Sequence, residues 1–287
     1  TTYHWLNYRQ SLSYLPVLLC LILIILFGVI GGVPMDIFYG VISCIGLIEL
    51  YRAFGLLNRC VGITGIIATI VYYLVKILNR FIPFRISLIA VAVVIVLVIL
   101  SIFVLRYPKY KIAQITEAIF GFIYVPVFMC YICQTRDMPG GVYMVWLIFL
   151  SSWGTDTCAY CVGRLFGKHK IAPLLSPGKS VEGAIGGVIG AAFLTCLVYG
   201  IVLRERLGLS QSAVIITVIA VAFGAYISMI GDLCASAIKR EFGIKDFGRI
   251  IPGHGGILDR MDSVLFTAPM VYIVLQVMEI QVLKLNL

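Results

Sequence analysis

Runs of apolar residues, each about 20 residues long, recur along the whole chain and limit what it can fold into. A run of this length crosses the hydrocarbon core of a bilayer as an α-helix, and a helix satisfies its own backbone hydrogen bonds in lipid. We expect spans at residues 12–33, 35–57, 61–78, 86–105, 112–133, 142–162, 181–203, 213–232 and 264–283. The predicted fold class is all-α: a polytopic integral membrane protein with about nine transmembrane helices.

The composition agrees with a chain that lipid surrounds. Hydrophobic residues make up 61% of the sequence and charged residues 12%, whereas soluble domains carry about 25% charged residues. The net charge of +9 does not indicate a nucleic-acid partner, because the basic residues fall in short clusters between apolar runs. We expect one membrane domain over residues 1–287, with N-terminal helices in 1–140 and the chemistry in 141–287.

The distribution of Lys and Arg predicts the orientation. With nine spans, these residues favour the side of the N-terminus by about two to one, and cytoplasmic loops carry such an excess. The N-terminus and the loop after residue 232 are therefore expected in the cytoplasm, where a soluble nucleotide is available. The expected location is a plasma or inner membrane, crossed several times.

Small residues repeat at the start of the expected span 181–203. Gly183 and Gly187 are four apart, as are Gly186 and Gly190, and this spacing lets two helices approach closely. We favour close packing over phosphate binding. The packing partner is either another helix of this chain or a second copy, so a homodimer stays open.

Polar and charged residues become dense between residues 231 and 263, with apolar spans on both sides. Asp232, Ser236 and Lys239 follow i, i+4, i+7 spacing and would share one helix face. An Asp at a membrane boundary is costly unless it faces a cation or a polar cavity. This face is therefore a candidate site.

A glycine-rich segment, residues 252–256, follows in the same stretch. Glycines permit close backbone approach, and free backbone N–H groups before a helix form an anion site. Asp259 and Asp262 are three apart on the next expected helix. Carboxylates, glycines and cations at one membrane surface suit a Mg²⁺–polyphosphate ligand. The plainer alternative is a charged loop whose ions pair with one another.

The order of residues in this stretch resembles a known signature. Ser236-x-x-Lys239-Arg240, followed by Lys245-Asp246-x-Gly248 and by the run from Ile251 to Asp262, is similar to the signature of the phosphatidate cytidylyltransferases, or CDP-diacylglycerol synthases. Upstream, Ser176-Pro177-x-Lys179-Ser180-x-Glu182-Gly183 and Trp153-x-x-Asp156 resemble two further motifs of that family. Gly178 departs from the pattern, since the family often carries a second basic residue there.

The resemblance implies a reaction of CTP with phosphatidate in the bilayer, giving CDP-diacylglycerol and pyrophosphate for phospholipid biosynthesis, with Mg²⁺ and a second cation, K⁺. It implies the following roles: metal ligands Asp232 and Asp259, with Asp156 and Asp262 as supporting carboxylates; catalytic residues Asp232, Lys239, Arg240, Asp259 and Asp262; and substrate-binding residues Lys179, Ser180, Ser236, Gly253, His254, Gly255, Gly256 and Arg260.

The implied chemistry needs no protein base. The nucleophile is a phosphate monoester with a second pKa of about 6, so it is already largely anionic at neutral pH. Metal ions and cationic side chains bring the two polyanions together and align the attack. His254, among glycines, is expected to shape the loop or to donate a hydrogen bond. Glu49 and Arg52 are expected to pair or to lie in the bundle interior, with no catalytic role.

Two other functions stay open from the sequence. A CTP-dependent polyprenol or lipid kinase would transfer the terminal phosphoryl group instead. An ion-coupled transporter would use Asp156 and Asp232 along an ion path, although we find no internal repeat. A CDP-alcohol phosphotransferase is set aside, because its D-G-x-x-A-R signature is absent.

Overall fold

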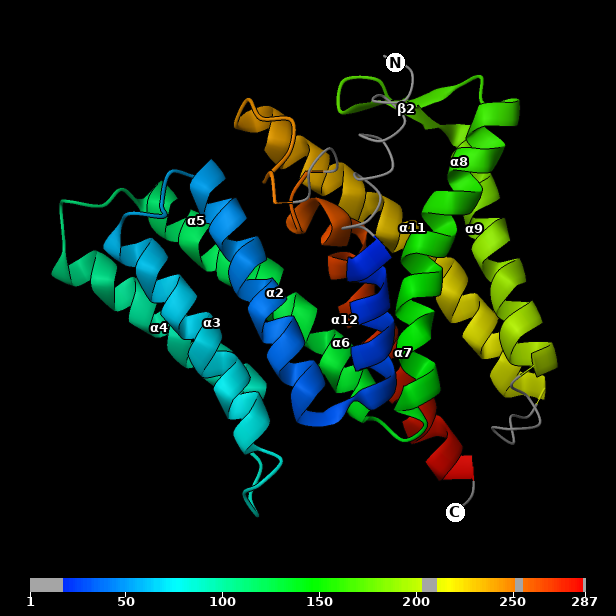
Figure 1. The fold of residues 1–287 in the computed structure, drawn as a ribbon, viewed down its shortest axis with the longest axis horizontal. Helices are drawn as coiled ribbons and strands as arrows, with labels where there is room; N and C mark the ends of the chain where they lie inside the picture. The colour runs from blue at the N-terminus through cyan, green and yellow to red at the C-terminus, as the bar shows by residue number, and fades with distance from the viewer. Residues whose placement is uncertain (1–17, 203–210, 251–254, 286–287) are drawn as a thin grey trace, which may run out of the picture. The chain divides into compact units, whose positions relative to one another are not determined.

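The computed structural model describes residues 18–202, 211–250 and 255–285, and most of these residues are helical (Figure 1). The chain divides into two units, which are treated separately below. Unit 1 comprises residues 1–133 and 242–261, and unit 2 comprises residues 134–241 and 262–287. The prediction of an all-α membrane protein is confirmed.

Unit 1 consists of membrane helices that follow one another with short connections. They are a helix over Leu18–Ile30, α2 (Gly32–Ala53), α3 (Cys60–Leu78), α4 (Leu88–Leu105), α5 (Ile112–Phe122), the π-helical turn η1 (Ile123–Val127) and the first part of α6 (Phe128–Asp137). A kink was expected at Pro126, and the helix there changes from α to π geometry, which accommodates a residue without a backbone N–H.

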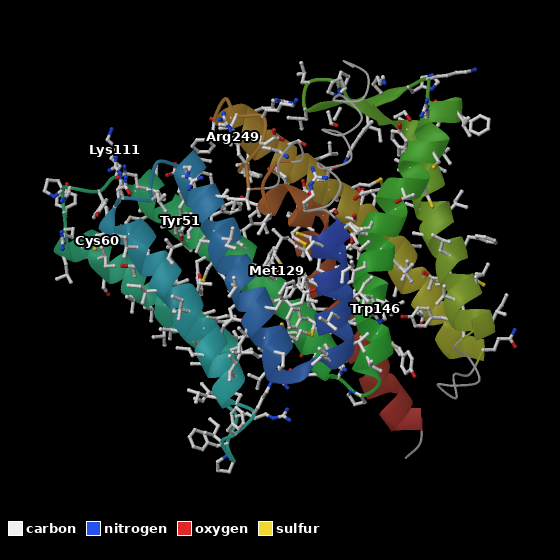
Figure 2. All side chains as sticks on the ribbon, in the orientation of Figure 1. Tyr51, Cys60, Lys111, Met129, Trp146 and Arg249 are labelled. Atoms are coloured by element: carbon white, nitrogen blue, oxygen red, sulfur yellow. The ribbon has the colours of Figure 1, made fainter. Side chains whose placement is uncertain are left out.

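Tyr51 organises the packing between α2, α3 and α5. Its ring is fully buried, and its hydroxyl donates a hydrogen bond to the Ala118 carbonyl at 2.6 Å (Figure 2). A Cβ at Gly65 would lie 2.4 Å from the Tyr51 hydroxyl, and one at Gly121 would lie 2.5 Å from the ring. The two glycines therefore make room for one aromatic anchor, which fixes the end of α2 that carries Glu49.

Unit 2 contains the remaining helices and one small sheet. These are α7 (Gly141–Phe149), the π-helical turn η2 (Leu150–Gly154), α8 (Thr155–Phe166), α9 (Val181–Thr195), the π-helical η3 (Cys196–Val202) and α11 (Gln211–Glu241). Strands β1 (Lys170–Ala172) and β2 (Ser176–Ser180) pair antiparallel, with Lys170 opposite Ser180. Helix α12 (Leu258–Leu285) begins in unit 1 and continues through unit 2.

The glycine pattern of α9 packs against α8, and the two helices lie side by side (Figure 1). A Cβ at Gly186 would lie 2.5 Å from Val162, and one at Gly190 would lie 2.5 Å from the Cys158 sulfur. Gly187 is similarly close to α8. The preferred interpretation, close packing, is confirmed, and the face is used within one chain.

Six helical segments of the described residues are long and apolar enough to cross a membrane. They are Gly32–Ala53, Cys60–Leu78, Leu88–Leu105, Ile112–Asp137, Val181–Ile201 and Thr217–Glu241. Of the other expected spans, 12–33 is described only in part, and 264–283 lies within α12. The span 142–162 carries a polar run from Ser151 to Thr157 through its middle. The chain is a multi-pass membrane protein.

Candidate active site

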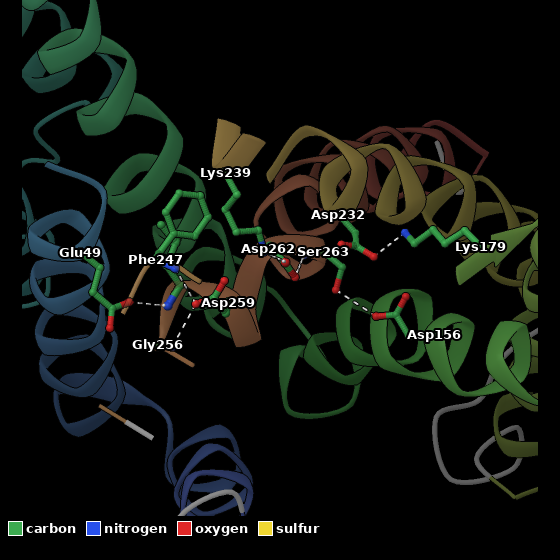
Figure 3. A network of polar contacts seen from close by, with 11 residues as sticks. Glu49, Asp156, Lys179, Asp232, Lys239, Phe247, Gly256, Asp259, Asp262 and Ser263 are labelled. Carbon is green, nitrogen blue, oxygen red and sulfur yellow. Dashed lines mark hydrogen bonds and ion pairs between the residues drawn. The ribbon is translucent and has the colours of Figure 1, made fainter. Parts of the chain in front are cut away.

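Three carboxylates from three helices meet in unit 2. Asp156 comes from the first turn of α8, Asp232 from α11 and Asp262 from the first turns of α12 (Figure 3). The Ser263 hydroxyl donates to Asp156 Oδ2 at 3.2 Å, and the Ser263 backbone N–H donates to Asp262 Oδ1 at 2.8 Å. Ser263 therefore joins the carboxylates of α8 and α12.

Two lysines partly neutralise these carboxylates. Lys179, at the end of β2, forms an ion pair with Asp232, and the Lys239 ammonium lies 3.9 Å from Asp262 Oδ2. Three carboxylates and two ammonium groups leave a formal charge of −3 + 2 = −1. The cluster therefore favours an additional cation.

The excess of negative charge in this cluster affects the pKa of the Asp262 carboxyl. Burial raises the pKa of its carboxyl to about 7, and the charges of Asp232 and Asp156 act in the same direction, whereas Lys239 opposes them. A cation bound beside Asp262 would favour the ionised form. A proton and a bound cation would therefore compete for the Asp262 carboxylate.

A cavity of about 400 Å³ opens beside the cluster, within unit 2. Asp156, Asp232, Lys179 and Arg164 line its polar part, while apolar residues such as Met229 and Leu233 form other parts of its wall. The volume is in the range of small-molecule sites. The cavity can accept an anionic headgroup next to its cations and an apolar group along its walls.

The chemistry of the donors fits Mg²⁺ that arrives with a nucleotide. Within the described ranges, no group of three or more His, Cys, Asp or Glu side chains is arranged to hold a metal by itself. Mg²⁺ commonly takes one or two protein carboxylates and completes its shell with water and substrate phosphates. Asp156, Asp232 and Asp262 offer such partial coordination.

Asp259 makes its contacts inside unit 1. Its Oδ2 accepts hydrogen bonds from the backbone N–H of Phe247 at 2.9 Å and of Gly256 at 3.0 Å (Figure 3). The side chain is 9% exposed. Asp259 therefore ties the segment before α12 to the segment around Phe247, and its expected role as a metal ligand stays a prediction.

Glu49 holds the same segment from helix α2. Its carboxylate accepts hydrogen bonds from the backbone N–H of Ile257 at 3.2 Å and of Leu258 at 2.9 Å, and the side chain is 1% exposed. Glu49 was expected either to pair with Arg52 or to lie in the bundle interior, and the structure shows it in the interior. The acceptor at the N-terminus of α12 is a protein carboxylate.

The expectation of free backbone N–H groups before α12 is wrong for three residues. Their backbone N–H groups are not free, because those of Gly256, Ile257 and Leu258 donate hydrogen bonds to the carboxylates of Asp259 or Glu49. Gly255 has a φ of 86°, a left-handed conformation that favours glycine. Gly253 and His254 lie outside the described residues.

The other predicted residues have these settings. Ser180 is buried and caps α9, since its hydroxyl accepts a hydrogen bond from the Gly183 N–H at 3.1 Å. Ser236 shares the continuous helix α11 with Asp232 and Lys239, as the spacing predicted. Arg240 and Arg260 are exposed.

Sequence reasoning missed two residues that make long-range contacts, Glu49 in unit 1 and Ser263 in unit 2. Glu49 carried one signal, a carboxylate inside an apolar run, which is costly unless it has a function or a partner. Ser263 carried none, because a hydroxyl on a helix start has many ordinary roles. Both act through contacts between segments that are distant in sequence.

The chain is similar to known members of one protein family. A model of the cytidylyltransferase family matches residues 12–278. A phosphatidate cytidylyltransferase of Staphylococcus saprophyticus is 41% identical over 178 residues, which is 62% of this chain and 65% of that protein. One of Staphylococcus haemolyticus is 39% identical over 181 residues, with the same coverage. One of Staphylococcus aureus is 32% identical over 251 residues, covering 85% of this chain and 91% of that protein. The alignment thus spans just under two thirds of the first two relatives.

Proposed function

This chain belongs to the cytidylyltransferase family, and we propose that it transfers the cytidylyl group of CTP to phosphatidate. The products are CDP-diacylglycerol and pyrophosphate. The relatives in Staphylococcus that bear the name phosphatidate cytidylyltransferase support this assignment. The protein would act in the plasma membrane of a bacterium, with its site on the cytoplasmic side.

The main support for this proposal is the cavity of unit 2, which is lined by cationic side chains, carboxylates and apolar residues. Lys179 and Arg164 suit the phosphate of an anionic lipid, and Met229 and Leu233 suit the adjoining apolar part. The carboxylates Asp156 and Asp232 line the same cavity. A site for a water-soluble nucleotide alone would not need the apolar walls.

Mg²⁺ is the metal that we assign to Asp156, Asp232 and Asp262, with K⁺ as a second cation on the strength of the resemblance. The resemblance also makes Asp259 a metal ligand, and we keep that assignment. Bound there, Mg²⁺ supplies positive charge that neutralises the triphosphate and the leaving pyrophosphate. Asp262 contributes as the carboxylate whose ionised form most needs a cation. Lys239, Arg240 and Arg260 are assigned to neutralising the triphosphate.

The protein residues position the reactants and supply charge. An oxygen of the phosphatidate phosphate attacks the α-phosphorus of CTP, a new P–O–P bond forms, and the bond between the α-phosphorus and the bridging oxygen breaks. Pyrophosphate leaves with that oxygen. Lys179 would hold the attacking phosphate, and no side chain needs to accept a proton, because the phosphate is already largely ionised at neutral pH.

The acceptor lipid tests this proposal. Purified protein in detergent with CTP and Mg²⁺ should release pyrophosphate when phosphatidate is present. Diacylglycerol or a polyprenol in its place should give no product. Consumption of CTP with those alcohols, and release of CDP, would instead assign a lipid kinase.

A further inference from the structure

Glu49 is a buried carboxylate that the proposed chemistry does not yet use. It lies near the C-terminal end of α2, within an apolar helix, and is 1% exposed. Carboxylates inside membrane helices are rare because their desolvation is costly, and they usually mark a functional contact. No ion pair with Arg52 appears among the described contacts, and the Arg52 side chain is exposed.

The partners of Glu49 are the backbone amides that open α12. Oε1 accepts from Ile257 and Oε2 from Leu258, so both oxygens hold one helix start. The negative charge also stands at the positive end of the α12 dipole. A neutral cap would satisfy one amide, whereas a carboxylate satisfies two and adds a favourable charge.

Two glycines show that the surrounding backbone closes tightly on this carboxylate. A Cβ at Gly248 would lie 2.0 Å from Glu49 Oε1, and one at Gly256 would lie 2.4 Å from the same atom. Real Cβ atoms do not approach that closely. The glycines at these positions therefore let two backbone segments pack against Glu49.

Asp259 completes the arrangement from the other end of the segment. It accepts from Gly256 and from Phe247, so the amides of three consecutive residues, 256 to 258, are held by two carboxylates within unit 1 (Figure 3). Removing the Glu49 oxygens would release two of these amides. The orientation of Asp259 and the backbone next to it would lose their support from α2.

We infer that Glu49 is a positioning residue for the nucleotide side of the reaction. It fixes residues 256–258 and, through them, Asp259, without touching the substrate. This inference rests on the proposed function and on the role that the resemblance implies for Asp259, which would hold the metal ion that accompanies CTP, whereas the cavity beside Lys179 would serve phosphatidate. Loss of Glu49 should therefore affect CTP more than phosphatidate.

The test uses Glu49→Gln, with Glu117→Gln as a matched control in the same unit. Glu117 is a partly exposed carboxylate on α5 with no assigned role. Glu49→Gln should lower kcat/KM for CTP by about tenfold or more, because it replaces one charged acceptor with a donor that faces an N–H. The KM for phosphatidate should stay within about twofold. Glu117→Gln should change neither constant.

Gly248→Ala tests the same contact from the loop side, because the added methyl would displace the Glu49 carboxylate. Its matched control is Gly200→Ala, where the nearest atom would be an ordinary 3.4 Å away. We expect the CTP-selective loss for Gly248→Ala only.

Hydrogen–deuterium exchange of residues 255–259 gives a readout that does not depend on turnover. Exchange there should become faster in Glu49→Gln and stay unchanged in Glu117→Gln. Faster exchange with normal CTP kinetics would reduce Glu49 to a structural cap and overturn the inference, as would equal losses for CTP and phosphatidate. Absence of cytidylyl transfer by the unaltered protein would instead refute the proposed function.

Discussion

Lys179 and Asp232 form an ion pair that joins strand β2 to helix α11 within unit 2. Their side chains are 25% and 27% exposed, so the pair lies at the edge of the cavity and is not deeply buried. Strands β1 and β2 are the only strands among the described residues, and β2 carries the Lys179 ammonium that pairs with Asp232. In the proposed site, the Lys179 ammonium would bind a substrate phosphate in place of Asp232, and Asp232 would then help to hold the metal ion.

Replacing Lys179 by Met should weaken binding of the lipid. The substitution keeps the apolar stem and removes the charge, so the KM for phosphatidate should rise about tenfold or more, as expected for a lost charge-assisted hydrogen bond. The KM for CTP should change much less. Initial rates at varied concentrations of each substrate measure both effects.

Lys170→Met is the control for that change, because Lys170 is an exposed lysine on β1, opposite Ser180. It should leave both constants unchanged. An equal effect of the two lysine substitutions would show that the hairpin acts only through its overall charge.

The raised pKa of Asp262, about 7, predicts how metal binding depends on pH. The folded chain holds a proton there that the unfolded chain, with a carboxyl pKa of about 4, has lost. The stability contributed by this group is therefore complete below about pH 4 and is lost as the pH rises to about 7. Mg²⁺ binds the ionised form, so the stabilisation that it provides should grow over the same pH range.

Thermal unfolding in detergent, with Mg²⁺ and with a chelator, measures this effect. The rise in Tm caused by Mg²⁺ should be larger at about pH 7.5 than at about pH 5.5. Asp262→Asn should remove most of that difference. A rise in Tm that is equal at both pH values in the unaltered protein would contradict the prediction.

The substitution Asp259→Asn distinguishes the hydrogen-bonding role of this side chain from its expected role as a metal ligand. The amide keeps an oxygen that can accept from Phe247 and Gly256, but it removes the charge that a metal ion would require. We expect normal expression and a loss of activity of about a hundredfold or more. Near-normal rates would show that Asp259 only holds the backbone before α12 and does not bind a metal ion. Glu241→Gln, at an exposed carboxylate, should behave like the unaltered chain.

The glycine face of α9 predicts a purely structural effect. Gly186→Leu places a large side chain where a single Cβ would already lie 2.5 Å from Val162, so α8 and α9 must move apart. Overpacking of this kind costs about 1–3 kcal/mol. Thermal unfolding in detergent should show a lower Tm, and a Tm equal to that of the unaltered protein would contradict the observed packing.

The helices could be predicted from the sequence, because apolar runs of span length leave a membrane chain few alternatives. The spacing of Asp232, Ser236 and Lys239 likewise placed them on one helix, and the glycine spacing of α9 indicated close packing. These features depend on neighbours in sequence or on the helical repeat.

The contacts that shape the site could not be predicted in this way. Glu49 reaches Leu258 across 209 positions of sequence, and Ser263 reaches Asp156 across 107. Periodicity carries no information on such pairs. The sequence also indicated free amides before α12, whereas the nearby Asp259 and the distant Glu49 accept their hydrogen bonds.

The fate of the phosphates of CTP distinguishes cytidylyl transfer from phosphoryl transfer. Purified protein is incubated with phosphatidate, Mg²⁺ and CTP that is labelled at either the α- or the γ-phosphate. We expect the α-label to enter the lipid and the γ-label to be recovered in pyrophosphate. Recovery of the γ-label in the lipid, or of no label in the lipid under conditions in which the protein stays folded, would contradict this expectation.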